Sequence, residues 1–196
     1  MISEELFTHE YLWRCSLALS QVEPDAMSEY HLALPSQLMT AAAFEAFVNF
    51  CGHALLPEIW ANERENFKGK GLELKIKCVA DSLPTFEWKK GEYPYQAIRE
   101  LLGFRDFVVH GKVHSSTYEA GETDDRQDFR FQLPFHSFLT LESADTSRTH
   151  VRKFSQSIVE AARRLDDHHL HFHHDAFNGP LGSGAGSMPY VEQDPA

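Results

Sequence analysis

One stretch of the chain is apolar on nearly every face of the helix that it would form. It begins at Pro35 and runs to about Leu55, and alanine, leucine, phenylalanine and valine fill most of its positions. Proline suits the first turn of a helix, where a missing backbone N–H costs nothing. A helix that is apolar all round has to be covered by other elements. The sequence therefore predicts a helical bundle with residues 35–55 as its central helix.

Other segments repeat apolar residues at the three- and four-residue steps of amphipathic helices. These segments are residues 4–20, 57–66, 72–82, 95–110 and 146–170. Between residues 112 and 145 the repeat disappears, and residues 129–133 alternate weakly, as a short strand or extended arm would. We expect an all-α bundle of four to five helices over residues 1–170, with an irregular or short β insertion before the last helix. Residues 171–196, rich in His, Gly and Ser, are expected to form a flexible tail.

Net charge and hydropathy exclude some classes of protein for this chain. The chain carries 18 Lys and Arg against 29 Asp and Glu, a net charge of −11. A broad basic surface for duplex nucleic acid is excluded, so any RNA contact must be local. No run approaches the roughly 18 apolar residues of a membrane span, and the first residues are acidic. We expect a cytoplasmic protein that does not enter the membrane.

The cysteines give no sign of a disulfide framework. Cys15, Cys51 and Cys78 are an odd number at wide spacing within apolar helical stretches. This spacing matches neither a set of disulfides nor a zinc-ligand pattern. We expect all three to be plain core residues.

The helix predicted over residues 95–110 carries a charged residue on its apolar side. Pro94 opens this helix and Gly111 closes it. On a helical wheel, Arg105 falls inside the apolar arc, where an unpaired charge would be costly. Glu45 is the one carboxylate within residues 35–55. We therefore expect a bidentate ion pair between Glu45 and Arg105.

Further polar residues lie close to this pair on the two helices. Asn49 follows Glu45 by four residues, so both lie on one face of the central helix. His110 lies roughly 140° round the helix from Arg105 and shares a polar face with Asp106. Asp106 can fix the tautomer of the His110 imidazole. His110 is then either a general acid or base, or simply a polar residue at a helix end.

The run from Arg105 to His110 reads Arg-Asp-Phe-Val-Val-His. In this it resembles the HEPN superfamily, whose signature is an Arg, a polar residue directly after it, and a His four to six residues after the Arg. Residues 42–49 also look like the second helix of several HEPN groups. The order of helices is similar over roughly residues 4–168, so the tail lies outside the resemblance.

The resemblance implies a small helical domain, commonly dimeric, in which two protomers line one cleft that cuts RNA without a metal or cofactor. It implies that Arg105 and His110 are the catalytic pair and Asp106 their polar support. We expect Glu45 and Asn49 to support the same site. Cleavage through the ribose 2′-hydroxyl would leave a 2′,3′-cyclic phosphate, with His and Arg supplying the proton shuttle and the cation. The expected partners are RNA or a nucleotide, a second copy of the chain, and an antitoxin or regulatory protein.

Other interpretations stay open. The Arg-to-His spacing recurs at Arg163 to His168 and at Arg164 to His169, so spacing alone chooses no site. Many HEPN domains bind a nucleotide, RNA or protein partner without cleaving. The histidine-rich run over residues 168–174 can bind zinc or nickel, because neutral imidazole is a common ligand for both metals.

Overall fold

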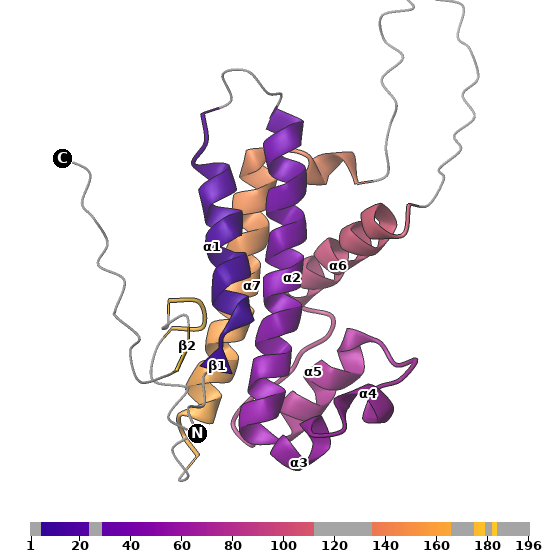
Figure 1. Ribbon diagram of the computed structural model, residues 1–196, viewed down its shortest axis with the longest axis vertical. Helices are drawn as coiled ribbons and strands as arrows, with labels where there is room; N and C mark the ends of the chain where they lie inside the picture. The colour runs from indigo at the N-terminus through magenta and orange to yellow at the C-terminus, as the bar shows by residue number, and fades with distance from the viewer. Residues whose placement is uncertain (1–4, 24–28, 112–134, 166–174, 179–181, 184–196) are drawn as a thin grey trace, which may run out of the picture.

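Helices make up nearly all of the regular structure in a computed structural model of the chain (Figure 1). The structure describes residues 5–23, 29–111, 135–165, 175–178 and 182–183. Its α-helices are α1 (Thr8–Ser20), α2 (Glu29–Leu55), α3 (Pro57–Trp60), α4 (Glu63–Asn66), α5 (Leu72–Asp81), α6 (Tyr95–Val109) and α7 (Leu141–Ala162). A 3-10 turn, η1 (His136–Phe138), precedes α7. The all-α class predicted from the sequence is confirmed for these residues. They form seven α-helices where four to five were expected, and the difference is the two four-residue helices α3 and α4.

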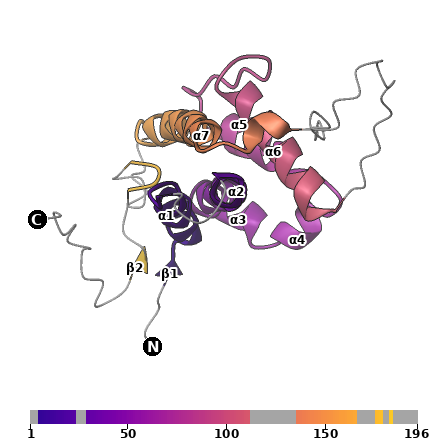
Figure 2. The ribbon, with the colours of Figure 1, turned by 90° about the horizontal axis from the view of Figure 1, so that it is seen from above.

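Helix α2 lies at the centre of the bundle. α1 and α7 run alongside it, α3 and α5 pack at its C-terminal half, and α6 packs against both α2 and α7 (Figures 1 and 2). The fully buried side chains of α2 include Phe44, Phe47, Val48 and Cys51. Gly52 lets Trp60 close over the helix, because a Cβ at Gly52 would lie 2.0 Å from the indole. The predicted central helix is therefore confirmed.

The start of α2 differs from the prediction. The helix begins at Glu29, so Pro35 lies inside it rather than in its first turn. A proline within a helix removes one backbone hydrogen bond and costs about 3 kcal/mol. The turns before Pro35 are nevertheless helical because they pack on the bundle, with Leu32 and Ala33 buried. Tertiary packing overrides the local signal for a helix start.

Helix α1 turns a partly polar face to the bundle. Its buried residues include His9, Trp13 and Ser16. Cys15 lies on the opposite side and is exposed, whereas Cys51 is buried and Cys78 is half-buried. The expectation that every cysteine lies in the core is therefore wrong for Cys15. The side of α1 that faces the bundle carries His9, Trp13 and Ser16 instead.

A buried arginine joins α7 to α1 and α2. Arg148 is 4% exposed, and its Nη1 donates to the Ser16 carbonyl oxygen (3.3 Å), to Ser16 Oγ (3.1 Å) and to Ser36 Oγ (2.6 Å). Its Nη2 pairs with Asp145 one turn earlier on α7. Thr40 completes the cluster, with its Oγ1 2.7 Å from Ser16 Oγ. A buried charge without hydrogen-bond acceptors is strongly unfavourable. The hydrogen bonds of Arg148 therefore hold α7 in place against α1 and α2.

Helix α7 also begins earlier than predicted, at Leu141 instead of residue 146. Thr140 caps it: Thr140 Oγ1 accepts from the Ser143 backbone N–H (3.1 Å), and Ser143 Oγ accepts from the Thr140 N–H (3.4 Å). The usual capping box has Glu or Gln where this helix has Ser143, so the start signal is weak in the sequence. The helix also ends earlier than the predicted residue 170, at Ala162, because residues 163–165 form a turn. Residues 166–170 lie outside the described residues, as does the insertion over residues 112–134 with its expected strand.

Residues 175–178 pack on the bundle, although a tail was expected from residue 171. Phe177 is 1% exposed and stacks on Trp13 of α1, with ring centroids 4.1 Å apart and planes at 10°. Asp175 pairs with Arg152 of α7. The strands β1 (Glu5–Leu6) and β2 (Gly182–Ser183) form a two-residue antiparallel pair. Residues 175–178 thus belong to the packed domain rather than to a flexible tail.

The length and composition of α2 would also suit a membrane span. Its 27 residues contain a window of mean hydropathy 1.2, of which 44% is buried in the bundle. The central helix of a bundle has the same properties. The cytoplasmic location expected from the sequence therefore stays a prediction.

His9 is a buried histidine among aromatic rings. The centroid of its imidazole lies 4.7 Å from that of Phe50, 5.8 Å from that of Phe47 and 6.2 Å from that of Phe177. Burial lowers the pKa of His9 from 6.5 to about 4, although Glu10 Oε1 lies 4.0 Å from its Nε2. The native protein therefore holds this imidazole neutral where an unfolded chain would protonate it.

Acid is expected to destabilise the fold through His9. Below pH 6.5 the unfolded state gains a proton at this residue that the native state accepts only near pH 4. The free energy of unfolding should fall by about 2 kcal/mol from this residue between about pH 7.5 and pH 5. Urea unfolding at both pH values measures it. The His9→Phe variant should lose this part of the pH dependence, whereas His53→Gln, at an exposed position, should keep it. An unchanged pH dependence in His9→Phe would contradict the assignment.

Candidate functional site

Helix α6 carries the Arg-to-His motif at its C-terminal end. Its apolar side is anchored by buried residues at helical spacing, which are Tyr95, Ile98, Leu101 and Phe104. The helix ends where the backbone N–H of His110 donates to the Asp106 carbonyl oxygen (3.2 Å) and Gly111 takes a left-handed φ of 55°. The predicted bounds of this helix, and its glycine stop, are confirmed.

Arg105 pairs with Glu45 across the boundary between α6 and α2. Its Nη1 donates to Glu45 Oε2 over 3.1 Å. The Arg105 side chain is 29% exposed and that of Glu45 is 36% exposed. The predicted pair is therefore present, but with one hydrogen bond instead of two and at a half-buried position instead of in the core. The long alkyl part of an arginine side chain lets its guanidinium extend from the apolar face of α6 to the solvent-exposed edge of the contact with α2.

Asp106 belongs with Arg105 more closely than with His110. Its Oδ1 lies 3.0 Å from Arg105 Nε, yet the Nε–H is not aimed at it and has no hydrogen-bond acceptor. Within the described part of the chain, no hydrogen bond or ion pair joins the Asp106 carboxylate to the His110 imidazole. The expected orienting role of Asp106 for His110 is therefore not visible in this arrangement. Asp106 instead adds a second carboxylate beside the guanidinium.

His110 lies at the exposed end of α6. Its neighbour Val109 is 62% exposed, and Phe107 and Val108 are half-buried. In the ribbon, this end of α6 points away from the bundle formed by α1, α2 and α7 (Figure 1). The imidazole is thus accessible to a molecule that approaches the tip of the helix, and an apolar surface lies beside it.

Asn49 lies in a second polar group on the same face of α2. Its Oδ1 accepts a hydrogen bond from Lys75 Nζ of α5 over 2.9 Å, and Lys75 also pairs with Glu63 of α4. The Lys75 side chain is only 12% exposed. Lys75 was not among the predicted site residues. The signal is its position on α5, where it is flanked at helical spacing by Leu72 and by the buried Val79.

The residues of these two polar groups carry charges of both signs. Arg105 and Lys75 supply two positive charges, and Glu45, Asp106 and Glu63 supply three negative charges within reach of them. Each cation therefore has a carboxylate neighbour. The group, which we call the α2–α6 polar strip, has no surplus of positive charge with which to attract a distant polyanion.

No cluster of three metal-ligating side chains is formed by the residues that the structure describes. The histidine-rich run over residues 168–174 lies outside those residues. The proposed metal ligands of that run are therefore a prediction from the sequence alone.

Comparison with protein-family models, with curated proteins and with solved structures finds no match to this chain. The site is therefore interpreted from its own residues and from the motif that they form.

The Glu45–Arg105 pair is expected to couple α2 to α6 by about 0.5 to 1 kcal/mol, because its two side chains are partly desolvated. A double-mutant cycle with Glu45→Ala and Arg105→Ala, followed by urea unfolding, measures this coupling. Lys77 and Asp81 form an exposed ion pair on α5 and serve as the matched control, with smaller expected coupling. Coupling between Glu45 and Arg105 no larger than that of the control pair would contradict the prediction.

Proposed function

We propose that this protein is a HEPN-like, metal-independent endoribonuclease whose active site forms between two copies of the chain. The observation that carries the proposal is the geometry of α6. Arg105 is held against α2 by Glu45, and His110 lies accessible at the tip of the same helix. A fixed cation and an accessible imidazole are the two groups that RNA cleavage through the 2′-hydroxyl requires. We place this activity in the cytoplasm.

The chemistry needs no metal. The ribose 2′-oxygen attacks the adjacent phosphorus while His110 accepts the 2′-hydroxyl proton. The guanidinium of Arg105 stabilises the negative charge that develops on the phosphorane oxygens. The bond from phosphorus to the 5′-oxygen then breaks, and that oxygen takes up a proton from an imidazolium. The products are a 2′,3′-cyclic phosphate and a free 5′-hydroxyl.

In this proposal, a second copy of the chain accounts for the different directions in which Arg105 and His110 point from α6. Arg105 lies at the boundary with α2, whereas His110 lies beyond it at the helix end. In a two-fold dimer, His110 of one protomer would face Arg105 of its partner across the interface. The exposed Val109 and the half-buried Phe107 supply apolar area for such a contact at the tip of α6.

The other residues of the α2–α6 polar strip have supporting parts in this proposal. Glu45 holds the guanidinium in place, and the Arg105 Nε–H is buried and has no acceptor. A phosphate oxygen would therefore meet the exposed part of the guanidinium, since the Arg105 side chain is 29% exposed. Asn49 holds Lys75, a second cation on the same face. Asp106 sits against Arg105 and limits where an anionic substrate can approach.

A second candidate function is a HEPN-like module that binds RNA, a nucleotide or a protein partner, such as an antitoxin, without cleaving. The observation that favours it is the neutralisation of Arg105 by Glu45 and by the nearby Asp106. The net charge of −11 also opposes the approach of a polyanion. In this case Arg105 has a structural role, and His110 is a polar residue at a helix end.

Cleavage of single-stranded RNA in excess EDTA tests the first candidate. The purified protein should cut RNA and leave 2′,3′-cyclic phosphate ends, which mass spectrometry of the products identifies. Arg105→Ala and His110→Ala should each lower the rate by about a hundredfold or more, because each removes one half of the chemistry. Arg164→Ala is the matched control, since Arg164 has the same spacing to a histidine and is exposed. Its rate should equal that of the wild type.

Two results would overturn the nuclease proposal. Folded wild-type protein that leaves RNA intact would leave the binding module as the function. Cleavage that survives in both Arg105→Ala and His110→Ala would place the activity elsewhere in the sample.

A further inference from the structure

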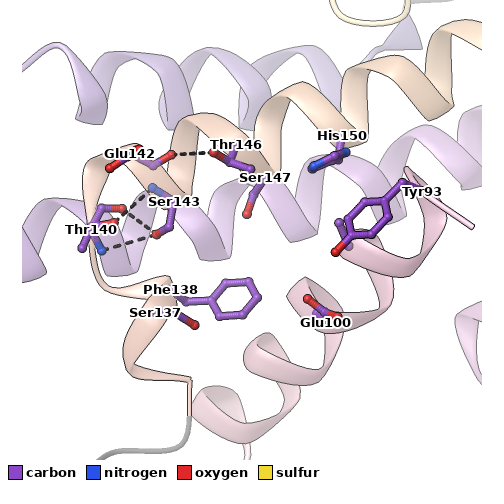
Figure 3. Close-up of a pocket in the computed structure, with 11 residues that line it drawn as sticks. Tyr93, Glu100, Ser137, Phe138, Thr140, Glu142, Ser143, Thr146, Ser147 and His150 are labelled. Atoms are coloured by element: carbon purple, nitrogen blue, oxygen red, sulfur yellow. Dashed lines mark hydrogen bonds between the residues drawn. The ribbon is translucent and has the colours of Figure 1, made fainter.

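A pocket of about 420 Å³ lies between α6 and α7, away from the Arg-to-His motif. The loop before α6 and the turn η1 close its two ends, and α6 and α7 form its walls (Figure 3). Its lining residues are Tyr93, Ala97, Glu100, Ser137, Phe138, Thr140, Glu142, Ser143, Thr146, Ser147 and His150. None of the residues of the α2–α6 polar strip is among them. We call this space the α6–α7 pocket.

Several side chains converge on the α6–α7 pocket. The rings of Tyr93 and Phe138 and the carboxylate of Glu100 point into it from three different elements (Figure 3). The His150 ring lies beside Tyr93, with centroids 5.3 Å apart. Ser147 is 8% exposed and directs its hydroxyl into the same space (Figure 3). A volume of this size accommodates a small organic molecule.

The charged residues that line the pocket favour a positively charged ligand. Glu100 and Glu142 are the lining residues with a fixed charge, and neither Lys nor Arg occurs among the described residues that line the pocket. Within the described chain, the Glu100 carboxylate has no hydrogen-bond or ion-pair partner. An accessible carboxylate in an acidic protein attracts cations and repels anions.

The N-terminus of α7 at one end of the pocket does not reverse this preference. A free helix N-terminus would favour an anion through its unpaired N–H groups. Here the Leu141 N–H donates to Glu29 Oε1 over 2.6 Å, and the Ser143 N–H donates to Thr140 Oγ1 over 3.1 Å. These donors already have acceptors, and one of the acceptors is itself a carboxylate.

The aromatic side chains of the pocket favour a ligand that contains an aromatic ring. Tyr93 and Phe138 face the pocket from opposite sides, and aromatic faces attract organic cations as well as flat apolar groups. Thr146 and Ser147 add hydroxyl oxygens that can accept from an ammonium N–H, whereas Ser143 Oγ already accepts from Gln37 and from the Thr140 N–H. We propose that the α6–α7 pocket binds an aromatic ring that carries a primary ammonium group on a short alkyl chain, with the ammonium at Glu100 and the ring between Tyr93 and Phe138.

A series of phenyl compounds that differ only in charge tests this proposal. Isothermal titration calorimetry of the full chain with phenethylamine should give saturable binding in the micromolar to low-millimolar range. 2-Phenylethanol should bind about tenfold more weakly, because it lacks the charge that pairs with Glu100 and with the rings. Phenylacetate should not bind. The Glu100→Gln variant should weaken phenethylamine binding about fivefold, as expected for an exposed ion pair.

Two further variants separate the pocket from unspecific attraction. Glu160→Gln removes an exposed carboxylate of α7 that does not line the pocket, and it should bind phenethylamine like the wild type. Ser147→Leu would fill the pocket and should abolish binding, with circular dichroism and thermal unfolding reporting whether the helices are kept. Equal weakening by Glu160→Gln and Glu100→Gln, equal binding of amine and alcohol, or tighter binding of phenylacetate would each overturn the proposal. Absence of any heat from phenethylamine would overturn it as well. The test involves no RNA, so its outcome is independent of the nuclease proposal.

Discussion

The arrangement of this protein depends on the need to cover α2 while pairing polar side chains on it with groups on the neighbouring helices. The helix is buried against α1, α3, α5, α6 and α7, and a buried polar group without a hydrogen bond costs about 1 to 3 kcal/mol. Ser36 and Thr40 meet Ser16 and Arg148, Glu45 meets Arg105, and Asn49 meets Lys75. Each of these contacts fixes the register of one neighbouring helix against α2. The apolar residues supply the driving force for packing, and the polar residues define one arrangement of it.

This constraint also positions the candidate site. The ion pair with Glu45 holds Arg105 at the boundary between the two helices. The last turn of α6 then extends past that boundary, so His110 and Val109 face solvent. The same pair that stabilises the packing of α6 therefore leaves an imidazole and an apolar patch at the helix tip. A surface of that kind is suited to a second protein chain.

The parts of the fold that could be predicted from the sequence are those marked by helical periodicity of apolar residues or by a charged residue within an apolar stretch. The apolar run of α2 and the glycine stop of α6 follow from residue patterns on single helices. The Glu45–Arg105 pair joins two helices but was still predictable, because Glu45 is the one carboxylate of residues 35–55 and Arg105 is a charge within an apolar arc. Other contacts between distant segments carry no such signal. The start of α2 before Pro35 depends on packing of Leu32 and Ala33, and the burial of Phe177 depends on Trp13, about 160 residues earlier in the chain. Lys75 was missed because α5 carries several charged residues, so no single one stands out as Arg105 does within its apolar arc.

The composite nature of the site is the central claim, and mixing two inactive variants tests it most directly. Arg105→Ala and His110→Ala proteins are mixed in equal amounts, allowed to exchange subunits, and assayed for RNA cleavage. If each site takes Arg105 from one protomer and His110 from its partner, half of the dimers are mixed and each mixed dimer has one intact site of two. The account therefore predicts about a quarter of the wild-type activity from two proteins that are inactive alone. A mixture that stays as inactive as its components would contradict it.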